Sequence, residues 1–145
     1  MRYLSVQSDK RLNFSAHIGL VKAAAKRTMS ALGRLMPNVQ GPSACKRRLL
    51  MSVALSKLLY TSSVWALTAA KTARNRTALS QAQRGAAIRV ARCYRTVSDM
   101  AAQVLARMPP AHLLADERRR IKQRKREPTT VAVIRRQERE ATLRE

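Results

Sequence analysis

The chain has 145 residues, which suffices for one ordinary domain and excludes an array of several. It contains 23 alanines, only 3% aromatic residues, 4 Gly and 5 Pro, a composition that excludes a turn-rich all-β fold and predicts a mainly α-helical one. The formal net charge of +22 points to an anionic partner.

The first half of the chain predicts one short strand and two helices. Arg2–Val6 is partly alternating and β-leaning, which favours a strand. A helix is expected from Asn13 or Ser15 to about Met36, where Pro37 ends it. A second helix begins at Pro42-Ser43 and runs through about Tyr60, with an extension to Ala70 left open. Its apolar positions recur at helical spacing: Leu50, Val53, Ala54 and Leu58.

The second half predicts three more helical segments. Between Asn75 and Tyr94 one apolar stripe is formed by Leu79, Ala82, Ala86, Val90 and Cys93. Thr96 and Asp99 fit a capping box for a helix that ends near Met108. Pro109-Pro110 suits the first turn of a further helix from about Ala111. From Pro128 onward the tail is charged and weakly patterned, so fraying or disorder is expected there.

Positive charge is concentrated in a span without acids. From Lys10 to Ser98 there are 17 basic residues and no carboxylate. Cations without internal counter-charges suit a surface that lies against phosphate, since each can displace a bound counterion. Nucleic acid is therefore the expected partner, and an anionic membrane surface is a weaker alternative because the chain has few aromatic anchors. The expected contacts are Lys46, Arg47, Arg48, Arg84, Arg92 and Arg95, for which a merely solvated helix face remains the plain alternative.

Two further features leave their roles open. Tyr94, between Arg92 and Arg95, suits stacking on a sugar or base, and packing at a helix end fits it equally well. The basic run from Arg118 to Arg126 is compatible with a nuclear address, a phosphate contact or a solvated helix end, and composition does not separate these.

No catalytic or metal site is predicted. Two-metal phosphoryl chemistry needs clustered carboxylates, whereas Asp9, Asp99 and Asp116 lie far apart in the sequence, and there is no Gly-rich phosphate loop. The histidines and cysteines lack metal-finger spacing. Cys45 and Cys93 are interpreted as buried, reduced thiols and Trp65 as a core anchor.

Nothing at the N-terminus has the pattern of a signal peptide, so an intracellular, nuclear or cytoplasmic protein is expected. Met51–Ala70 is rather apolar, but Lys57 lies inside it together with serines and a tyrosine. This segment is interpreted as a buried core helix and not as a membrane span.

Four blocks of the chain, in order over about residues 2–120, resemble the region downstream of the catalytic motifs in LINE-type (non-LTR) retrotransposon reverse transcriptases. The resemblance is closest to arthropod elements of the jockey kind and of the kind that inserts into ribosomal DNA. The first block is Arg2–Val6 with Asp9, Leu12, Phe14, His17 and Ile18, and the second is Gly33–Val39, Lys46–Leu50, Leu58–Tyr60, Val64 and Trp65. The third is Gln83-Arg84, Arg89-Val90 and Tyr94–Ser98, and the fourth is Pro109-Pro110, Leu113-Leu114 and Glu117-Arg118.

The resemblance implies a thumb-like helical bundle that grips a template–primer duplex, RNA–DNA or DNA. Residues 1–14 would be a remnant of the palm edge, 15–127 the thumb-like bundle, and 128–145 a charged tail. Tyr3 and Leu4 would lie by the primer end. The contacts to the nucleic-acid backbone would come from Lys46–Arg48, Arg84 and Arg92–Thr96. Ser5 occupies the family's usual glycine position, where its side chain disfavours a close approach of the backbone.

The chain is accordingly expected to be a non-catalytic, truncated piece without cofactor, although the full-length family enzyme uses Mg²⁺. The remainder of a reverse transcriptase would be its other partner. The alternative function is that of a small basic structural RNA-binding protein resembling a ribosomal component, which shares the charge but has no tie to a polymerase.

Overall fold

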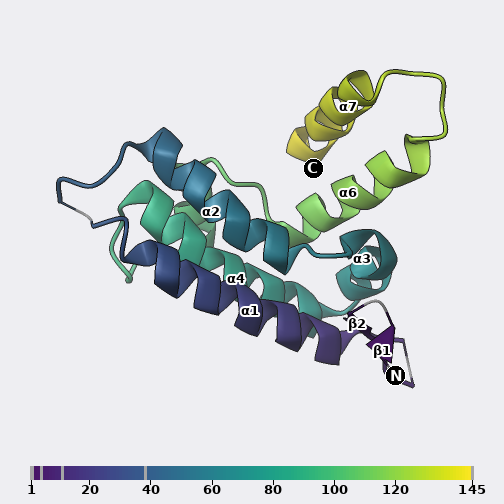
Figure 1. Ribbon diagram of the computed structural model, residues 1–145, viewed down its shortest axis with the longest axis horizontal. Helices are drawn as coiled ribbons and strands as arrows, with labels where there is room; N and C mark the ends of the chain where they lie inside the picture. The colour runs from purple at the N-terminus through teal and green to yellow at the C-terminus, as the bar shows by residue number, and fades with distance from the viewer. Residues whose placement is uncertain (1, 4, 11, 38, 145) are drawn as a thin grey trace.

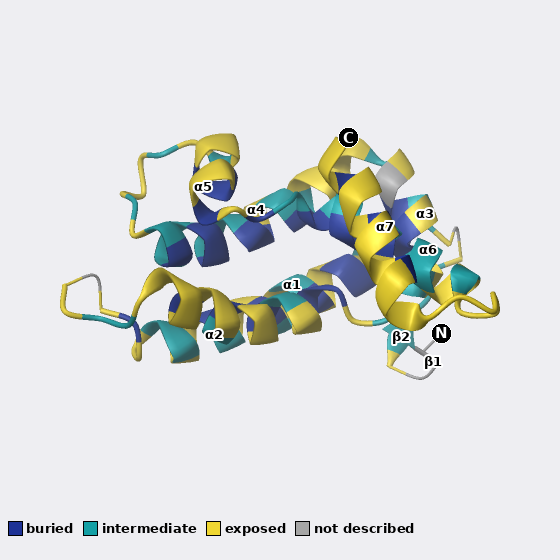
Figure 2. Ribbon diagram, turned by 90° about the horizontal axis from the view of Figure 1, so that it is seen from above, coloured by how far each residue is buried: buried dark blue, intermediate teal, exposed yellow. Residues whose placement is uncertain are grey.

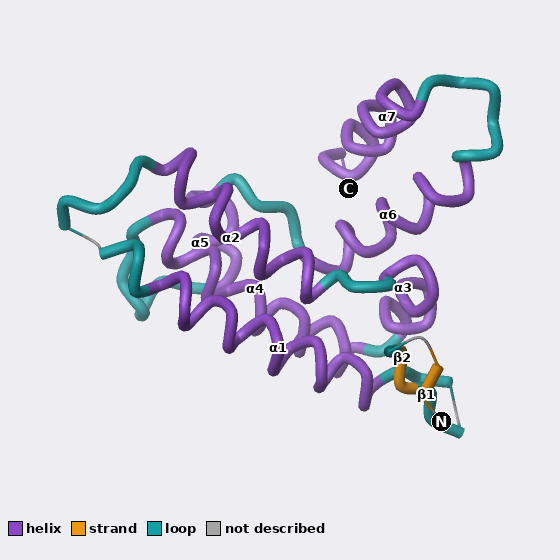
Figure 3. Tube along the Cα trace, in the orientation of Figure 1, coloured by secondary structure: helices purple, strands orange, loops and turns teal. Residues whose placement is uncertain are grey.

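The computed structural model describes the chain except Met1, Leu4, Arg11, Asn38 and Glu145, and for Arg2, Tyr3 and Ala70 it describes only the backbone. The described residues form two short strands and seven helices (Figure 1). The elements are β1 (Arg2–Tyr3), β2 (Val6–Gln7), α1 (Ser15–Gly33), α2 (Ala44–Leu58), α3 (Ser62–Lys71), α4 (Ala73–Ala91), α5 (Asp99–Ala106), α6 (Ala111–Arg124) and α7 (Val131–Arg144). The mainly α-helical fold predicted from composition is confirmed, as the trace makes plain (Figure 3).

Helix α4 is the centre of the bundle. It packs against α1, α2, α3, α5 and α6. Helices α1 and α2, which run antiparallel to each other, lie beside it (Figure 1). The predicted apolar stripe of α4 is confirmed for Leu79, Ala82, Ala86 and Val90, which are all buried (Figure 2). Its fifth expected member, Cys93, lies beyond the end of α4 and is half-buried. Its small alanines leave room for the side chains of several neighbouring helices, which explains how one helix supports so many contacts.

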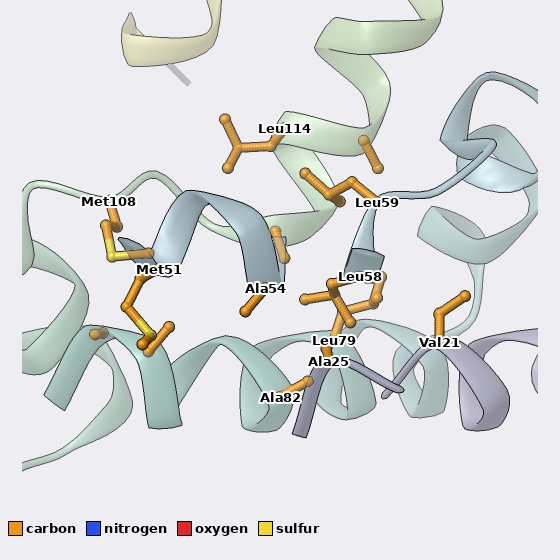
Figure 4. Packing of buried hydrophobic residues seen from close by; sticks show 14 of the residues in the cluster. Val21, Ala25, Met51, Ala54, Leu58, Leu59, Leu79, Ala82, Met108 and Leu114 are labelled. Atoms are coloured by element: carbon orange, nitrogen blue, oxygen red, sulfur yellow. The ribbon is translucent and has the colours of Figure 1, made fainter. Parts of the chain in front are cut away.

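The hydrophobic core lies between α1, α2 and α4 and continues toward α6 (Figure 4). Leu58 of α2 is 1% exposed and Met51 is completely buried. Their neighbours in the core include Val21 and Ala25 of α1, Leu79 and Ala82 of α4, and Leu114 of α6. This core fixes α2 with one face inward and the opposite face in solvent, which matters for the candidate interface.

The chain breaks sharply between α2 and α3, so the extension of the second helix to Ala70 is not realised as one helix. Thr61 has φ 50°, a left-handed conformation that a β-branched residue rarely adopts. Trp65 holds the break, because its indole Nε1 donates a hydrogen bond to the carbonyl oxygen of Tyr60 at 2.9 Å. Its ring is fully buried and meets the ring of His17 edge-on at 6.1 Å. The prediction of Trp65 as a core anchor is confirmed.

Over the part of the chain that the structure describes, no single helix is long and apolar enough to cross a membrane. Helix α2 and the segment 62–69 of α3 meet the length and composition of a span only when taken together, and they are bent by 77° at the break.

Three local expectations differ from the structure. The strand expected over Arg2–Val6 is a tight antiparallel hairpin in which Tyr3 pairs with Val6, since Ser5 has φ 66° and turns the chain. Helix α5 is capped by Ser98, whose Oγ accepts a hydrogen bond from the amide of Ala101 at 3.3 Å, and not by Thr96. Cys45 is exposed and Cys93 half-buried, so the expectation of two buried thiols was wrong.

The C-terminal tail also differs from the expected frayed segment, because residues 131–144 form helix α7. Ile134, Glu138 and Thr142 are its buried residues, spaced four apart on one face. That face packs on α6, where Arg120 donates hydrogen bonds to Glu138 at 2.7 Å and to Thr142 at 2.9 Å. Charged partners on α6 therefore order a segment whose own sequence carries little apolar periodicity.

Candidate nucleic-acid interface

Two parts of the molecule differ in how their charged side chains are paired, the α6–α7 hairpin and helices α1–α4. In the α6–α7 hairpin (residues 111–144) the carboxylates are neutralised locally, for example Asp116 by Arg119 at 2.8 Å and Glu140 by Arg136 at 3.1 Å. Among the described residues, the only carboxylate paired with a cation of α1–α4 is Asp99, whose Oδ1 lies 2.8 Å from Nε of Arg84. Within the part of the chain that the structure describes, the other cations of these four helices have no carboxylate partner, and they are available to an external anion or held by carbonyl groups.

The first predicted contact cluster, Lys46–Arg48, begins α2, and its members differ in position. Lys46 and Arg48 are exposed. Arg47 is completely buried, and its guanidinium donates hydrogen bonds to the carbonyl oxygens of Pro42 at 2.9 Å, Met36 at 3.3 Å, Arg89 at 3.2 Å and Pro37. Burial, and then the nearby charge of Arg92, lower the pKa of Arg47 from its ordinary value. Arg47 thus ties the α1–α2 loop to α4, and a phosphate contact by this residue does not fit the structure.

The second predicted cluster lies at the same end of the bundle. Nη2 of Arg92 donates to the carbonyl oxygens of Gly41 at 3.2 Å and Pro42 at 2.7 Å, immediately before α2. Arg84 is held by Asp99 and by the carbonyl oxygens of Arg95 at 2.5 Å and Val97 at 2.8 Å. These two arginines hold the backbone of neighbouring segments, although Arg92 remains exposed.

The loop that follows α4 carries the remaining predicted contacts. Tyr94 is 84% exposed, and Arg95 and Thr96 are exposed beside it. An exposed tyrosine between arginines is consistent with stacking on a base or sugar, and the alternative of helix-end packing does not fit so large an exposure.

Of the two predicted primer-end residues, only the backbone of Tyr3 is described, and it lies at the opposite end of the bundle. Leu4 is outside the described residues, and Tyr3 is described only as part of β1, which lies near the start of α1 (Figure 1). Helix α1 has 19 residues and separates the two ends by about 28 Å at 1.5 Å per residue. The sequence-predicted site therefore comprises two groups that the structure does not bring together.

A groove between α1 and α2 runs from the β1–β2 hairpin toward the middle of the bundle. We call it the α1–α2 groove; its volume is about 600 Å³, and its lining is mostly apolar. Arg27 of α1 and Lys57 of α2 lie in its wall. The complete lining is Ser5, His17, Leu20, Val21, Ala24, Arg27, Val53, Ser56, Lys57 and Tyr60.

A second, smaller groove of about 320 Å³ lies on the other side of α2, and we call it the α2–α6 groove. Ser56 lines both grooves, so the exposed face of α2 forms a ridge between them. Four arginines line the α2–α6 groove: Arg48, Arg107, Arg118 and Arg139. Glu117 is its acidic lining residue and is bound to Arg139 at 3.0 Å.

The α2–α6 groove brings together residues that the sequence did not single out. Arg107 is an isolated arginine in the sequence and Arg139 belongs to the charged tail, and no local pattern marks either as a contact. Arg118 belongs to the basic run for which a phosphate contact was one of three open roles. The signal that identifies all three is tertiary, because they converge on Arg48 from helices far apart in the chain.

Not every cation lies along α2. Lys22 and Arg74 line a further pocket between α1 and α4, away from α2. The positive charge is thus spread over more than one face, and the two grooves beside α2 are distinguished by the convergence of cations from several elements.

Among the described residues, no three His, Cys, Asp or Glu side chains gather closely enough to hold a metal ion. Comparison with known proteins gives no match to a family model, to a curated protein or to a solved structure. The arrangement of helices and cations therefore carries the functional argument.

Proposed function

We propose that this chain binds a nucleic-acid duplex along its phosphate backbone, with the exposed face of α2 as the central contact. The observation that carries the proposal is the ridge of α2 between two grooves that both contain cations, two in the α1–α2 groove and four in the α2–α6 groove. Among the described residues, the cations of α1–α4 have a single carboxylate partner, Asp99. A convex helix flanked by basic concavities suits a duplex, because the phosphates on either side of a groove can each meet one set of cations.

The proposal extends to a thumb-like module of a reverse transcriptase of the non-LTR retrotransposon kind, itself non-catalytic. The ordered sequence blocks support this extension, and the helical bundle is compatible with it. In such a module α1, α2 and α4 form the body that grips a template–primer duplex, and the β1–β2 hairpin with Tyr3 lies toward the primer end. The remainder of the polymerase is then the protein partner.

The contacts of this surface are chiefly to phosphate and sugar. Its cations are Arg and Lys, which bind phosphate regardless of the base, and a moving polymerase has to grip every sequence equally. Such binding is driven by the release of counterions, so its affinity depends steeply on salt concentration.

The test is a salt titration of affinity for an RNA–DNA hybrid of about 20 base pairs. The cations of the two grooves alone, with Arg139 discounted for its pairing with Glu117, give about five phosphate contacts. The plot of log affinity against log salt is therefore expected to have a slope of about −4 to −5 or steeper. A slope near zero would refute the proposal.

A comparison of ligands separates the proposal from a structural RNA-binding role. Hybrids of unrelated sequence are expected to bind within about threefold of one another, as for phosphate contacts. A folded single-stranded RNA of the same length that binds more than tenfold tighter than every hybrid would favour the small basic RNA-binding protein instead.

A further inference from the structure

A further concavity lies where the start of α3 meets the α6–α7 hairpin, and we call it the junction pocket. Its volume is about 630 Å³. Five basic side chains line it against one acidic side chain, Glu117. The basic residues are Arg118, Lys122, Lys125, Arg135 and Arg139, and the others are Leu59, Thr61, Ser62, Ser63 and Ile121.

The cations come from two helices and are anchored at the wall. Nη1 of Arg118 donates to the carbonyl oxygen of Leu59 at 3.3 Å, and Nζ of Lys122 donates to Oγ of Ser63 at 3.4 Å. Nη2 of Arg139 lies 3.0 Å from Oε1 of Glu117. Because these contacts hold the three groups in place around the pocket, their positive charges stay close together instead of spreading into solvent.

Within the α6–α7 hairpin the cations divide into two sets. Carboxylates neutralise Arg119, Arg120, Arg124 and Arg136. In the described structure Lys122, Lys125 and Arg135 have no ion pair, and all three line the junction pocket. Arg126 and Arg144 are also exposed and without an ion pair in the described structure, but they do not line it.

The lining of the pocket carries an excess of positive charge, because five cations face the single carboxylate of Glu117. Burial, and the nearby charge of Arg139, lower the pKa of Arg118, whereas Glu117 acts in the opposite direction. Like charges held near one another in a concave site raise the local positive potential, and a bound anion relieves it.

We propose that the junction pocket is a phosphate-binding site. A phosphate group offers several acceptor oxygens to the converging guanidinium and ammonium donors, which match it in charge and geometry. The pocket shares Leu59, Glu117, Arg118 and Arg139 with the α2–α6 groove, so a strand lying in that groove can place a backbone phosphate here. This source of the phosphate rests on the proposed function; free phosphate is the other source of the same chemistry.

The test uses the full chain and two matched double variants. Lys122→Gln with Arg135→Gln removes two exposed charges from the pocket, and Arg126→Gln with Arg144→Gln removes two exposed charges from the same hairpin outside it. Two ligands are measured: the RNA–DNA hybrid by affinity, and inorganic phosphate by the rise in Tm over chloride at equal ionic strength.

The pocket variant is expected to bind the hybrid about tenfold more weakly, with a salt slope reduced by about one to two, while the control changes affinity less than threefold. Loss of the phosphate-induced rise in Tm together with loss of hybrid affinity supports one site for both sources. Loss of the hybrid response alone assigns the pocket to backbone phosphate, and loss of the phosphate response alone assigns it to free phosphate.

Equal responses of the two variants to both ligands would overturn the site, and the proposed function would survive if wild-type binding remained salt-dependent. If the pocket variant loses its helical circular dichroism, the single change Lys125→Gln at an exposed residue of the pocket replaces it, with Arg126→Gln as its control. Equal responses of these two single variants to the hybrid and to phosphate would likewise overturn the site.

Discussion

The guanidinium of Arg47 donates a hydrogen bond to the carbonyl oxygen of Arg89, 3.2 Å away, and so joins the first turn of α2 to the last turn of α4. Its other donors serve Pro42, Met36 and Pro37 in the loop that precedes α2. A fully buried cation that satisfies four carbonyl oxygens is a structural element of the bundle. Its neighbour Arg48 lies one residue along the helix and lines the α2–α6 groove.

The first prediction separates folding from binding at these adjacent arginines. Arg47→Ala leaves buried carbonyl groups without donors, and is expected to lower the free energy of unfolding by about 3 kcal/mol. Arg48→Ala is expected to change stability by less than about 0.5 kcal/mol, since Arg48 is exposed, and to weaken binding of the hybrid. Urea denaturation followed by circular dichroism measures the first effect, and a binding titration measures the second. Equal stability of the two variants would contradict the structural role of Arg47.

Helical phase accounts for what could be predicted of the fold. The apolar spacing of α2 and α4 placed these helices within a few residues of their ends, and Pro37 and Pro109 did the same for the end of α1 and the start of α6. The break at Thr61 was not visible, since neither Gly nor Pro marks it, and tertiary contacts of Trp65 hold its left-handed conformation. Helix α7 was missed because Glu138 and Arg120, 18 residues apart, stabilise it by polar contacts that local periodicity does not report.

The sequence predicted which helices carry the cations of the candidate site, but not which individual residues face the grooves. The acid-free span correctly located helices without internal counter-charges, yet composition alone treats Lys46, Arg47 and Arg48 as equivalent. Their positions on the helix distinguish them, because Arg47 shares one face with the buried residues Met51, Ala54 and Leu58. The arginines that complete the α2–α6 groove come from three other segments, and only the packing of α6 and α7 brings them to α2.

The second prediction concerns pH and His17. Its Nδ1 accepts a hydrogen bond from the amide of Gln7 at 3.4 Å, which requires a neutral ring. Burial lowers the pKa of His17 below its ordinary 6.5, and the carbonyl group of Tyr60 only partly opposes this. A base whose pKa is lower in the folded state contributes its full stability above pH 6.5, and loses it as the pH falls below that value, because the unfolded chain binds the proton first.

The free energy of unfolding is therefore expected to decline between pH 7 and pH 5.5 in the wild type. In His17→Phe, which cannot bind the proton, this decline is expected to disappear. Denaturant titrations at four pH values measure it. A decline that persists unchanged in His17→Phe would show that another group is responsible.

The third prediction concerns the docking of α7 through Glu138. Burial alone would raise the pKa of this carboxyl, but hydrogen bonds from Arg124 at 2.9 Å and Arg120 at 2.7 Å outweigh it and lower the pKa below its ordinary 4.5. The stabilisation is therefore complete above pH 4.5 and is lost as the pH falls through and below that value.

Glu138→Gln removes this charge, and is expected to cost about 1–2 kcal/mol at pH 7 and progressively less toward pH 3. Glu140→Gln is the matched control, because its pair with Arg136 is exposed and such pairs contribute little. Thermal melts of both variants from pH 7 to pH 3 measure the difference. An equal loss of Tm in the two variants at pH 7 would argue against a stabilising role of Glu138.

The last prediction asks whether nucleic acid uses one face of the molecule or all of its positive charge, and it rests on the proposed function. Arg27→Glu with Lys57→Glu reverses both cations of the α1–α2 groove, and Arg74→Glu with Arg76→Glu reverses two exposed cations at the start of α4. Both variants change the net charge by the same amount, so long-range attraction falls equally in each. If a duplex lies along α2, the groove variant is expected to lose at least tenfold more affinity for the hybrid than the α4 variant, since only the former places carboxylates against phosphate. The affinities are measured at two salt concentrations. Equal losses of affinity in the two variants would mean that the cations act only through their summed charge, and that the ridge of α2 has no special part in binding.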